Sequence, residues 1–411
     1  MSASLLTTRQ SFGLFAVALV VLGATSFVRT PPGWQGEWDG ETTMLVTNSV
    51  YRKVTRGWAA PMGYPFDFTQ GDRTATWYSK RTDQNYYKQF GLPVYLLAAI
   101  APRDVDALGQ FLLAARYVAT AAGVVVAAAL ITLFARRCGM CVGLALLGFV
   151  ASDWKFGTFL HSLYWVPWLS LLPLAEVMAA YSPGMTTRKL VGVLALFAVT
   201  VFTRALCGYE HISVPVLTAC AGVVICGRPA GWRVLARDAS WFVVVGGLGV
   251  AAAILTHFLA LYFTFGSVED AIQNTVGNAL SRSLMANDTR GSAGTLRAHL
   301  FGAYGVLAQH KLLTVLMGAW GLALAVWSVW SGRLEPRVGP GPRLSTLGVA
   351  SVLAFLAACS WIVLMRVHVA MAPQYNGLLF FLGFVWFAVP FVTAVIRAAV
   401  VTARGTPLEG N

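Results

Sequence analysis

The amino-acid sequence predicts an all-α polytopic membrane protein with about ten transmembrane helices. Of its 411 residues, 57% are hydrophobic and only 11% are charged, whereas a soluble domain carries about 25% charged residues. A chain of this length cannot bury so many apolar side chains in one water-soluble core, so most of them must face lipid. Long apolar runs separated by short polar connections recur along the chain, as they do in successive membrane spans.

The formal net charge of +13 does not indicate nucleic-acid binding. The basic residues are scattered between the apolar runs and do not form one polar face. Arginines at the ends of membrane spans, together with attraction for anionic lipid or phosphate, explain this charge better. We therefore expect membrane lipids, and no nucleic acid, among the partners.

The first span covers residues 11–28 and precedes the long polar region of the chain. Residues 29–109 form a predicted extracytoplasmic loop, which is too aromatic to be disordered. Prolines and glycines interrupt any long helix in it, so we expect a compact loop with short helices on the membrane surface. Its apolar run at residues 91–101 is shorter than the roughly 20 residues that span a bilayer, and we interpret this run as a re-entrant or interfacial segment.

The rest of the chain, residues 110–401, forms the predicted helical bundle. A second extracytoplasmic loop at residues 267–309 interrupts it, and a cytoplasmic tail at residues 402–411 follows it. All these parts belong to one integral membrane domain that covers residues 1–411. The spans are expected at residues 110–135, 140–153, 158–180, 190–204, 211–227, 240–266, 310–330, 345–365 and 376–401.

Lysine and arginine in the short connections predict the orientation of the bundle. Cytoplasmic connections carry an excess of these residues, so both termini are expected in the cytoplasm. Alanine- and valine-rich spans with frequent arginine are typical of a GC-rich bacterial genome, which indicates a bacterial inner (plasma) membrane. The basic residues that fall on alternate connections are Arg136, Arg137, Arg188, Lys189, Arg228, Arg233, Arg237, Arg333, Arg337, Arg343, Arg397 and Arg404.

Two acidic motifs lie on the predicted extracytoplasmic side. The first, Trp34-Gln-Gly-Glu-Trp-Asp-Gly-Glu41, follows the first span directly, and the second, Ser152-Asp-Trp-Lys155, lies on the next outer turn. This arrangement resembles the GT-C superfamily of integral membrane glycosyltransferases. The resemblance implies an enzyme of cell-envelope glycan biosynthesis. Such an enzyme takes a sugar from a polyprenyl-phosphate or polyprenyl-diphosphate donor and passes it to a glycan, lipid or protein acceptor on the outer face.

Glycosyl transfer needs a base that takes the proton of the acceptor. Asp39 is our first candidate for this role and Glu41 the second, because a carboxylate near a low-dielectric surface is a stronger base. Alternatively, these acidic side chains accept hydrogen bonds from the backbone of the loop or form ion pairs with its basic residues. Asp153 would assist Asp39, ligate Mg²⁺ or Mn²⁺ together with it, or pair with Lys155. The sequence leaves that metal open and indicates no other cofactor.

The departing phosphate needs cationic support. Arginine offers two donors to phosphate oxygens and keeps its charge. Interfacial snorkelling is the alternative explanation, and for any single arginine it is favoured over phosphate binding. The candidate phosphate ligands are Lys155, Arg204, Arg282, Arg290, Arg297 and Arg366.

Further polar and aromatic residues on the outer side are expected to line a substrate pocket. Trp38 would stack on a sugar face, although tryptophan also collects at membrane interfaces. His161 has helix packing as its alternative role. The predicted pocket residues are Glu37, Trp38, His161, Glu210, His211, His368 and Tyr375.

Two other functions compete with the enzyme. A transporter or lipid flippase would use the acidic residues as part of its gate, but the sequence has no visible internal repeat of the spans and no broken helices in matching halves. A non-catalytic membrane assembly protein of the same fold is the other alternative.

Overall fold

The described part of the chain is a bundle of helices. The computed structural model describes residues 6–29, 46–47, 49–51, 53–54, 62–63, 85–86, 90–164, 166–227, 231–277, 342–364, 380 and 382–403. Within these residues the only strands are β1 (Met62–Gly63) and β2 (Asn85–Tyr86), which pair antiparallel. Five described helices are long and apolar enough to cross a membrane, which indicates a membrane protein: Thr8–Val28, Asp106–Cys138, Thr187–Cys207, Trp232–Phe265 and Leu344–Trp361.

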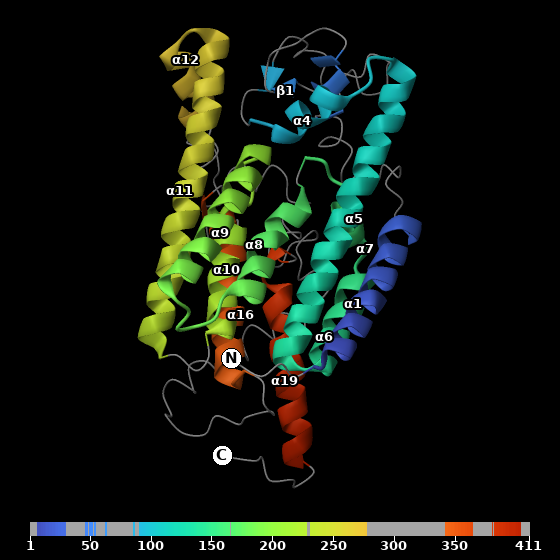
Figure 1. The fold of residues 1–411 in the computed structure, drawn as a ribbon, viewed down its shortest axis with the longest axis vertical. Coiled ribbons are helices and arrows are strands. Elements are labelled where there is room, and N and C mark those ends of the chain that lie inside the picture. Colours follow the sequence, from blue (N-terminus) through green and yellow to red (C-terminus); the bar gives the residue numbers. More distant parts are fainter. Residues whose placement is uncertain are drawn as a thin grey trace, which may run out of the picture.

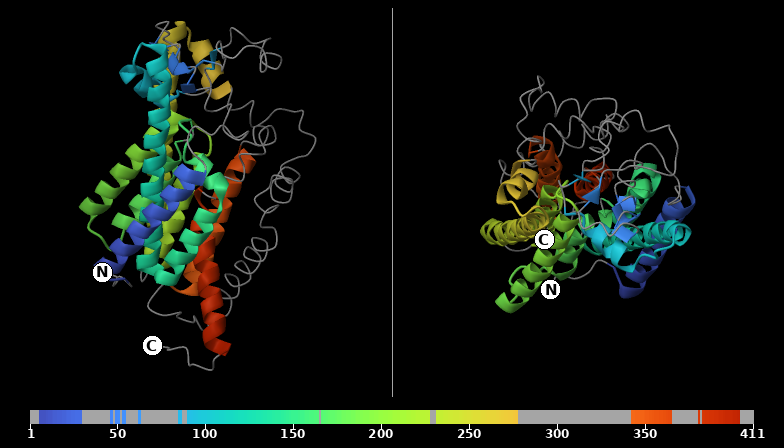
Figure 2. Two further views of the ribbon diagram at one scale, coloured as in Figure 1. Left: turned by 90° about the vertical axis from the view of Figure 1, so that its right-hand side faces the viewer. Right: turned by 90° about the horizontal axis from the view of Figure 1, so that it is seen from above.

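The bundle has two distinct ends (Figure 1). The loop end, uppermost in Figure 1, carries α4 (Leu92–Ile100), β1 and α12 (Val268–Ile272), which η3 (Gln273–Gly277) follows. The terminal end is where α1 begins and α19 ends, and the side view of Figure 2 shows the same division. The bundle helices are α1 (Thr8–Gly23) with its extension η1 (Ala24–Arg29), α5 (Val105–Cys138), α6 (Met140–Ser152), α8 (Pro167–Ala180), α9 (Thr187–Cys207), α10 (Ser213–Cys226), α11 (Trp232–Phe265), α16 (Leu344–Leu364) and α19 (Val385–Ala403).

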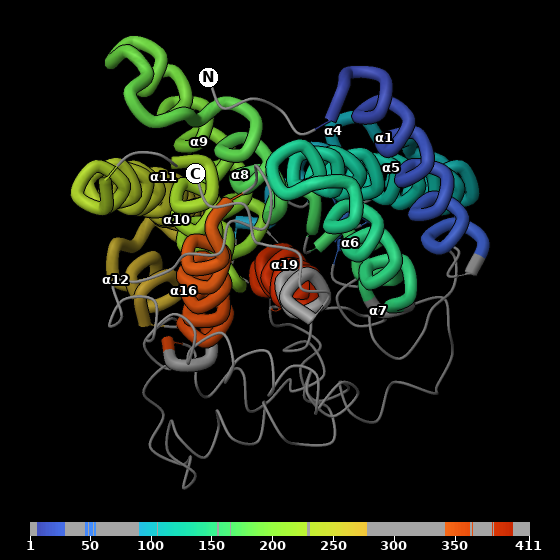
Figure 3. Tube along the Cα trace, turned by 90° about the horizontal axis from the view of Figure 1, so that it is seen from below, coloured from blue at the N-terminus to red at the C-terminus, as the bar shows by residue number. Residues whose placement is uncertain are grey.

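Six helices form a closed ring. Around it, α5 packs on α8, α8 on α10, α10 on α16, α16 on α19, α19 on α6, and α6 on α5. Figure 3 shows α1 outside α5 and α6, and α9 and α11 outside α8 and α10. Phe134 of α5 contacts Trp386 and Phe387 of α19 across the ring, with ring centroids 6.5 and 5.5 Å apart. These buried aromatic side chains fill the ring there.

The predicted spans agree with most of these helices. Seven predicted spans each coincide with a described helix: 11–28, 110–135, 140–153, 190–204, 211–227, 240–266 and 345–365. The predicted span at residues 376–401 coincides with α19 from Val385 onward. α6, α8 and α10 are shorter than a usual span, and residues 310–330 lie outside the described part of the chain, so the count of ten stays a prediction. α4 has nine residues, in agreement with a segment too short to span.

The prediction of one continuous span at residues 158–180 is wrong. The structure has instead a short helix, α7 (Trp154–Phe159), then turns, and then α8 from Pro167. Proline lacks the N–H that a continuing helix needs and disfavours helical geometry in the residue before it. Val166 lies outside the right-handed helical region, with a left-handed φ of 41°. Pro167 starts the new helix, where its fixed φ is favourable.

Of the basic residues in the predicted cytoplasmic connections, those at the ends of α5, α9 and α11 lie at the terminal end. α5 ends with Arg136 and Arg137, α9 begins with Arg188 and Lys189, and Arg233 lies in the first turn of α11. The polar turns that follow α6 and α9 lie on the other side, toward the loop end (Figure 1). This is the alternation that the sequence predicts.

The helices differ greatly in length, and this difference positions the polar turns. α5 and α11 have 34 residues each, which corresponds to about 51 Å. α6, α8 and α10 have 13 or 14 residues, or about 20 Å. The connections at the upper ends of these short helices therefore lie part-way along α5 and α11.

Close packing of α11 depends on glycine. A Cβ atom on Gly246 would lie 2.9 Å from Val216 Cγ1 of α10 and 3.1 Å from Phe197 Cε1 of α9, whereas one on Gly247 would meet no atom within 4 Å.

We expect Gly246→Ala to destabilise the protein by about 1–3 kcal/mol through overpacking. Gly247→Ala should be neutral or stabilising by up to about 1 kcal/mol, because alanine favours the helix. Thermal unfolding in detergent measures both, and equal midpoints would contradict this packing.

Candidate functional site

Two connections carry the polar groups of the candidate site. The α6–α8 connection comprises residues 153–166 and contains α7, and the α9–α10 turn comprises residues 208–212. The Tyr209 hydroxyl donates to Ala253 O of α11 at 3.4 Å, and α11 continues 12 residues, or about 18 Å, beyond Ala253. Both connections therefore lie below α4 and β1, within the height of the long helices (Figure 1).

Arg204 organises the α9–α10 turn. Its side chain is 1% exposed, and each guanidinium nitrogen donates to the protein: Nε to Ser170 Oγ at 2.7 Å, Nη1 to Gly208 O at 2.6 Å and Nη2 to Glu210 O at 2.8 Å. Carbonyl groups at the end of a helix otherwise lack partners. Arg204 thus holds the end of α9, the turn and α8 together. The role of Arg204 as a phosphate ligand stays a prediction, in addition to this structural role.

The turn presents two buried ionisable residues, Glu210 and His211, each 3% exposed. His211 has a φ of 63°, a left-handed conformation that costs a residue other than glycine about 1–3 kcal/mol. Its ring meets the ring of Trp361 on α16 edge-on, with centroids 5.5 Å apart. Backbone strain of this kind concentrates at functional sites, so the turn is the best-supported part of the candidate site.

The α6–α8 connection brings in Asp153 and His161. Asp153 is half-buried, and its Oδ1 accepts a hydrogen bond from Phe156 N at 3.1 Å, which caps α7. His161 is fully buried, and its Nε2 lies 2.8 Å from Ser26 O of η1. Because a carbonyl oxygen only accepts, Nε2 carries the hydrogen of this bond. His161 therefore ties the connection to the end of the first span.

The two connections are neighbours. Tyr164 of the α6–α8 connection lies near the Arg204 side chain, and so does Glu210. Arg116 of α5 likewise lies near His161. The structure thus brings five buried polar side chains of α5 and the two connections into one region: Arg116, His161, Tyr164, Arg204 and Glu210.

The remaining predicted site residues lie outside the described part of the chain. These residues are Glu37, Trp38, Asp39, Glu41, Arg282, Arg290, Arg297, Arg366, His368 and Tyr375. Lys155 lies in α7, but its side chain is not described. Among the described residues, no group of three or more His, Cys, Asp or Glu side chains could hold a metal ion. The Asp39–Asp153 metal site stays untested, because Asp39 is not among them.

No protein-family model, curated protein or solved structure matches this chain.

Several ionisable residues inside the apolar helices escaped the sequence prediction. An ionisable residue within an apolar run is costly and marks a functional site by default, and this signal was present in the sequence. The residues are Arg116 of α5, Glu176 of α8, and Asp238 and His257 of α11, all buried.

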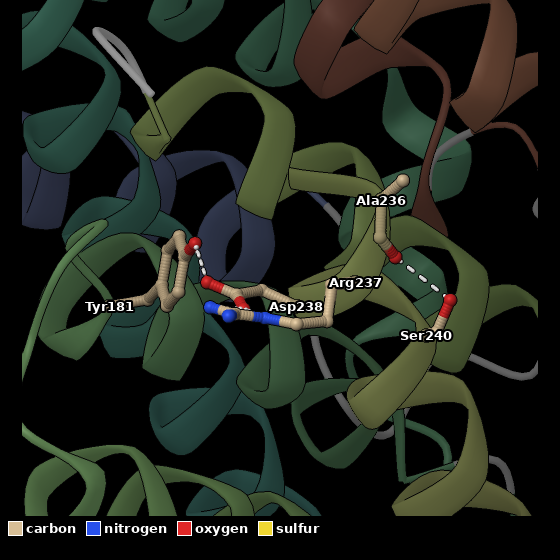
Figure 4. A network of polar contacts seen from close by, with 5 residues as sticks. All are labelled: Tyr181, Ala236, Arg237, Asp238 and Ser240. Carbon is tan, nitrogen blue, oxygen red and sulfur yellow. Dashed lines mark hydrogen bonds and ion pairs between the residues drawn. The ribbon is translucent and has the colours of Figure 1, made fainter. Parts of the chain in front are cut away.

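Asp238 belongs to a polar network near the terminal end (Figure 4). Its Oδ2 accepts a hydrogen bond of 2.7 Å from the hydroxyl of Tyr181, at the end of α8. Its Oδ1 pairs with Arg237 Nη2 at 2.8 Å, and the Arg237 side chain is 65% exposed. Ser240 in the same view donates only to Ala236 O of its own helix. The buried Asp238 carboxylate therefore links α8 to α11 and has its cation at the edge of the bundle.

A stack of side chains joins the loop end to the α9–α10 turn. The ammonium of Lys53 lies 4.1 Å from the centroid of the Tyr95 ring on α4, and Tyr95 stacks on Phe90 at 4.9 Å. Phe90 meets His257 edge-on at 6.4 Å, and His257 lies 5.7 Å from the Tyr209 ring. α4 is thus packed on the site side of the bundle. Burial raises the pKa of Tyr95 to about 12.

Lys53 provides a pH-dependent test of this stack. Burial lowers the pKa of Lys53 from its ordinary 10.5 to about 8, against the preference of the aromatic face for the cation. We expect an amine-reactive reagent to modify Lys53 about tenfold faster at pH 9 than at pH 7, because only the neutral amine reacts. A lysine with the ordinary pKa would show an increase of about 100-fold over the same range. Between pH 8 and 10.5 the unfolded chain binds more protons at this residue, so folding stability should rise with pH there.

Mass spectrometry of labelled peptides measures the rate at each pH. Lys189, which is exposed at the terminal end, is the internal comparison. If the labelling rates of Lys53 and Lys189 had the same pH dependence, Lys53 would not be buried against Tyr95.

Proposed function

We propose that this protein is a membrane glycosyltransferase. It moves a sugar from a polyprenyl-phosphate or polyprenyl-diphosphate donor to an acceptor at the loop end of the bundle. In this proposal the loop end faces the extracytoplasmic side of a bacterial inner membrane, both termini are cytoplasmic and the chain crosses about ten times.

One observation carries the proposal: the His161–Ser26 contact holds the end of the first span against the α6–α8 connection. In the sequence, the acidic residues Glu37–Glu41 begin eight residues after η1 ends at Arg29. The contact therefore joins the end of the first span, which the predicted acidic base follows in the chain, to the connection that carries Asp153.

The chemistry would divide between the loop and the bundle. Asp39, with Glu41 as the alternative, takes the proton of the acceptor hydroxyl. At the same time the oxygen of that hydroxyl attacks the anomeric carbon of the donor sugar. The bond to the donor phosphate breaks, and arginines of the outer loops balance the charge of the leaving phosphate. Lipid-linked donors reach such a site from the membrane, which suits a site built at the ends of membrane helices.

Transfer of radiolabelled sugar is the direct test. The full-length protein in lipid nanodiscs is offered a panel of polyprenyl-phosphate sugars together with a membrane glycan extract, and heat-inactivated protein is the control. Transfer of label to the extract or release of polyprenyl phosphate supports the proposal. If no donor in the panel binds or reacts, the proposal fails.

A transporter or flippase is the second candidate, because one observation favours it. The break between α7 and α8 and the buried Arg116 and Glu176 are features that also occur at membrane transport sites. Sealed vesicles loaded with a lipid-linked or soluble sugar distinguish the two functions. Flux without any covalent transfer would favour the transporter, whereas transfer without flux favours the enzyme.

A further inference from the structure

Glu176 is an acidic residue in the interior of the bundle. It lies on α8, which packs on α5, α9 and α10, and it is the only ionisable residue of that helix. Its side chain is 8% exposed. Thr200 Oγ1 of α9 lies 2.5 Å from Glu176 Oε1, and Oε2 has no hydrogen-bond partner among the described residues.

Several ionisable groups of the surrounding helices make other contacts. Arg137 of α5 donates to Met178 O at 3.0 Å, and Arg204 of α9 uses its three nitrogens on Ser170, Gly208 and Glu210. On α10 the ionisable groups are Cys220 and Cys226, which donate to backbone oxygens. Asp238 of α11 pairs with Arg237. Within the described part of the chain, no cation pairs with Glu176.

An ionised carboxylate in this position would be unstable. Moving an unpaired charge from water into a low-dielectric interior costs several kcal/mol even after the surroundings relax, and one hydrogen bond to a neutral hydroxyl restores about 1.5–3 kcal/mol. Binding a proton removes the charge. The 2.5 Å separation from Thr200 suits an O–H···O bond with the hydrogen on either oxygen.

We propose that Glu176 is a proton-binding site that holds a neutral carboxylic acid inside the bundle at neutral pH. Along α8 it lies six residues from Ser170 and five from Tyr181, or about 9 and 7.5 Å. The site therefore lies between the Arg204 cluster and the Asp238 network. It is separate from the outer-face residues of the proposed transferase, and its occupancy does not depend on glycosyl transfer.

Infrared spectroscopy of the protein in a detergent that contains no ester or carboxyl group tests this site. A protonated carboxyl has a C=O stretch above the amide bands, which moves down in D₂O, whereas ionised carboxylates do not absorb there. At neutral pH we expect such a band in the parent and its loss in Glu176→Gln. The matched control is Asp238→Asn, which removes a buried but ion-paired carboxylate and should leave the band unchanged.

Thr200→Val provides a second readout if Glu176→Gln fails to fold. Removing the hydroxyl weakens hydrogen bonding to the carboxyl, so the band should move to higher frequency with its intensity retained. The proposal is overturned if the parent has no carboxyl band at neutral pH, if the band survives in Glu176→Gln, or if Thr200→Val leaves its frequency unchanged.

Discussion

Asp39→Asn is expected to lower the rate of sugar transfer by about 10²–10⁴-fold, the usual contribution of a general base. Asparagine has nearly the same shape as aspartate but cannot take the proton of the acceptor. Binding of the polyprenyl-phosphate donor should therefore persist while turnover falls. Single-turnover assays with labelled donor, together with a separate donor-binding measurement, distinguish these two effects. Transfer at the parental rate would remove Asp39 from the mechanism.

The companion variants separate chemistry from folding. Glu269→Gln changes an exposed acid of α12 at the same end of the bundle and should leave transfer unchanged. Asp153→Asn keeps the cap on α7, because asparagine caps helices as well as aspartate does. A loss of transfer in Asp153→Asn without a change in thermal stability would thus indicate a role in catalysis or metal binding rather than in structure.

Arg204→Met is expected to cost about 3–5 kcal/mol of stability. The substitution leaves three buried acceptors without their donor, on Ser170, Gly208 and Glu210, and each loss is worth about 1–3 kcal/mol before relaxation. Arg204→Lys should be intermediate, because an ammonium keeps the charge but cannot reproduce the planar fork. Unfolding in detergent micelles, followed by tryptophan fluorescence, measures these differences.

Arg188→Met is the matched control for this experiment. Arg188 lies on the same helix as Arg204, is exposed and sits at the opposite end, so its loss should change stability little. Equal unfolding midpoints for Arg204→Met and Arg188→Met would contradict the role of Arg204 in holding the turn. A variant that stays folded but no longer binds the donor would instead support the predicted phosphate contact.

Helix positions were predictable because they depend on local composition. The apolar runs at 110–135 and 190–204 became α5 and α9, since only a helix satisfies its own backbone groups in lipid. The break at Val166–Pro167 was also encoded locally, by the proline. Hydropathy alone does not reveal that a new helix begins at a proline inside an apolar run. Length and hydropathy therefore predict where helices lie better than where they are interrupted.

The candidate site was predictable only in part. Arg204, Glu210 and His211 stand out in the sequence because they lie close together at the end of an apolar run. Their partners do not stand out, because Ser170 is 34 residues from Arg204 in the chain. Likewise, Thr200 is 24 residues from Glu176, and Tyr181 is 57 from Asp238. A single sequence carries no record of which distant helices pack together.

The sequence by itself determined that this is a helical membrane protein and that basic connections alternate with polar turns along the chain. Those properties follow from the cost of placing backbone and charge in lipid, which acts on each segment separately. Only the tertiary structure decided that Arg204 holds its own turn, that His161 binds the end of η1, and that Glu176 faces Thr200 and pairs with no cation among the described residues. These contacts depend on the packing of helices around a shared interior, where the partner of each polar group is set by geometry.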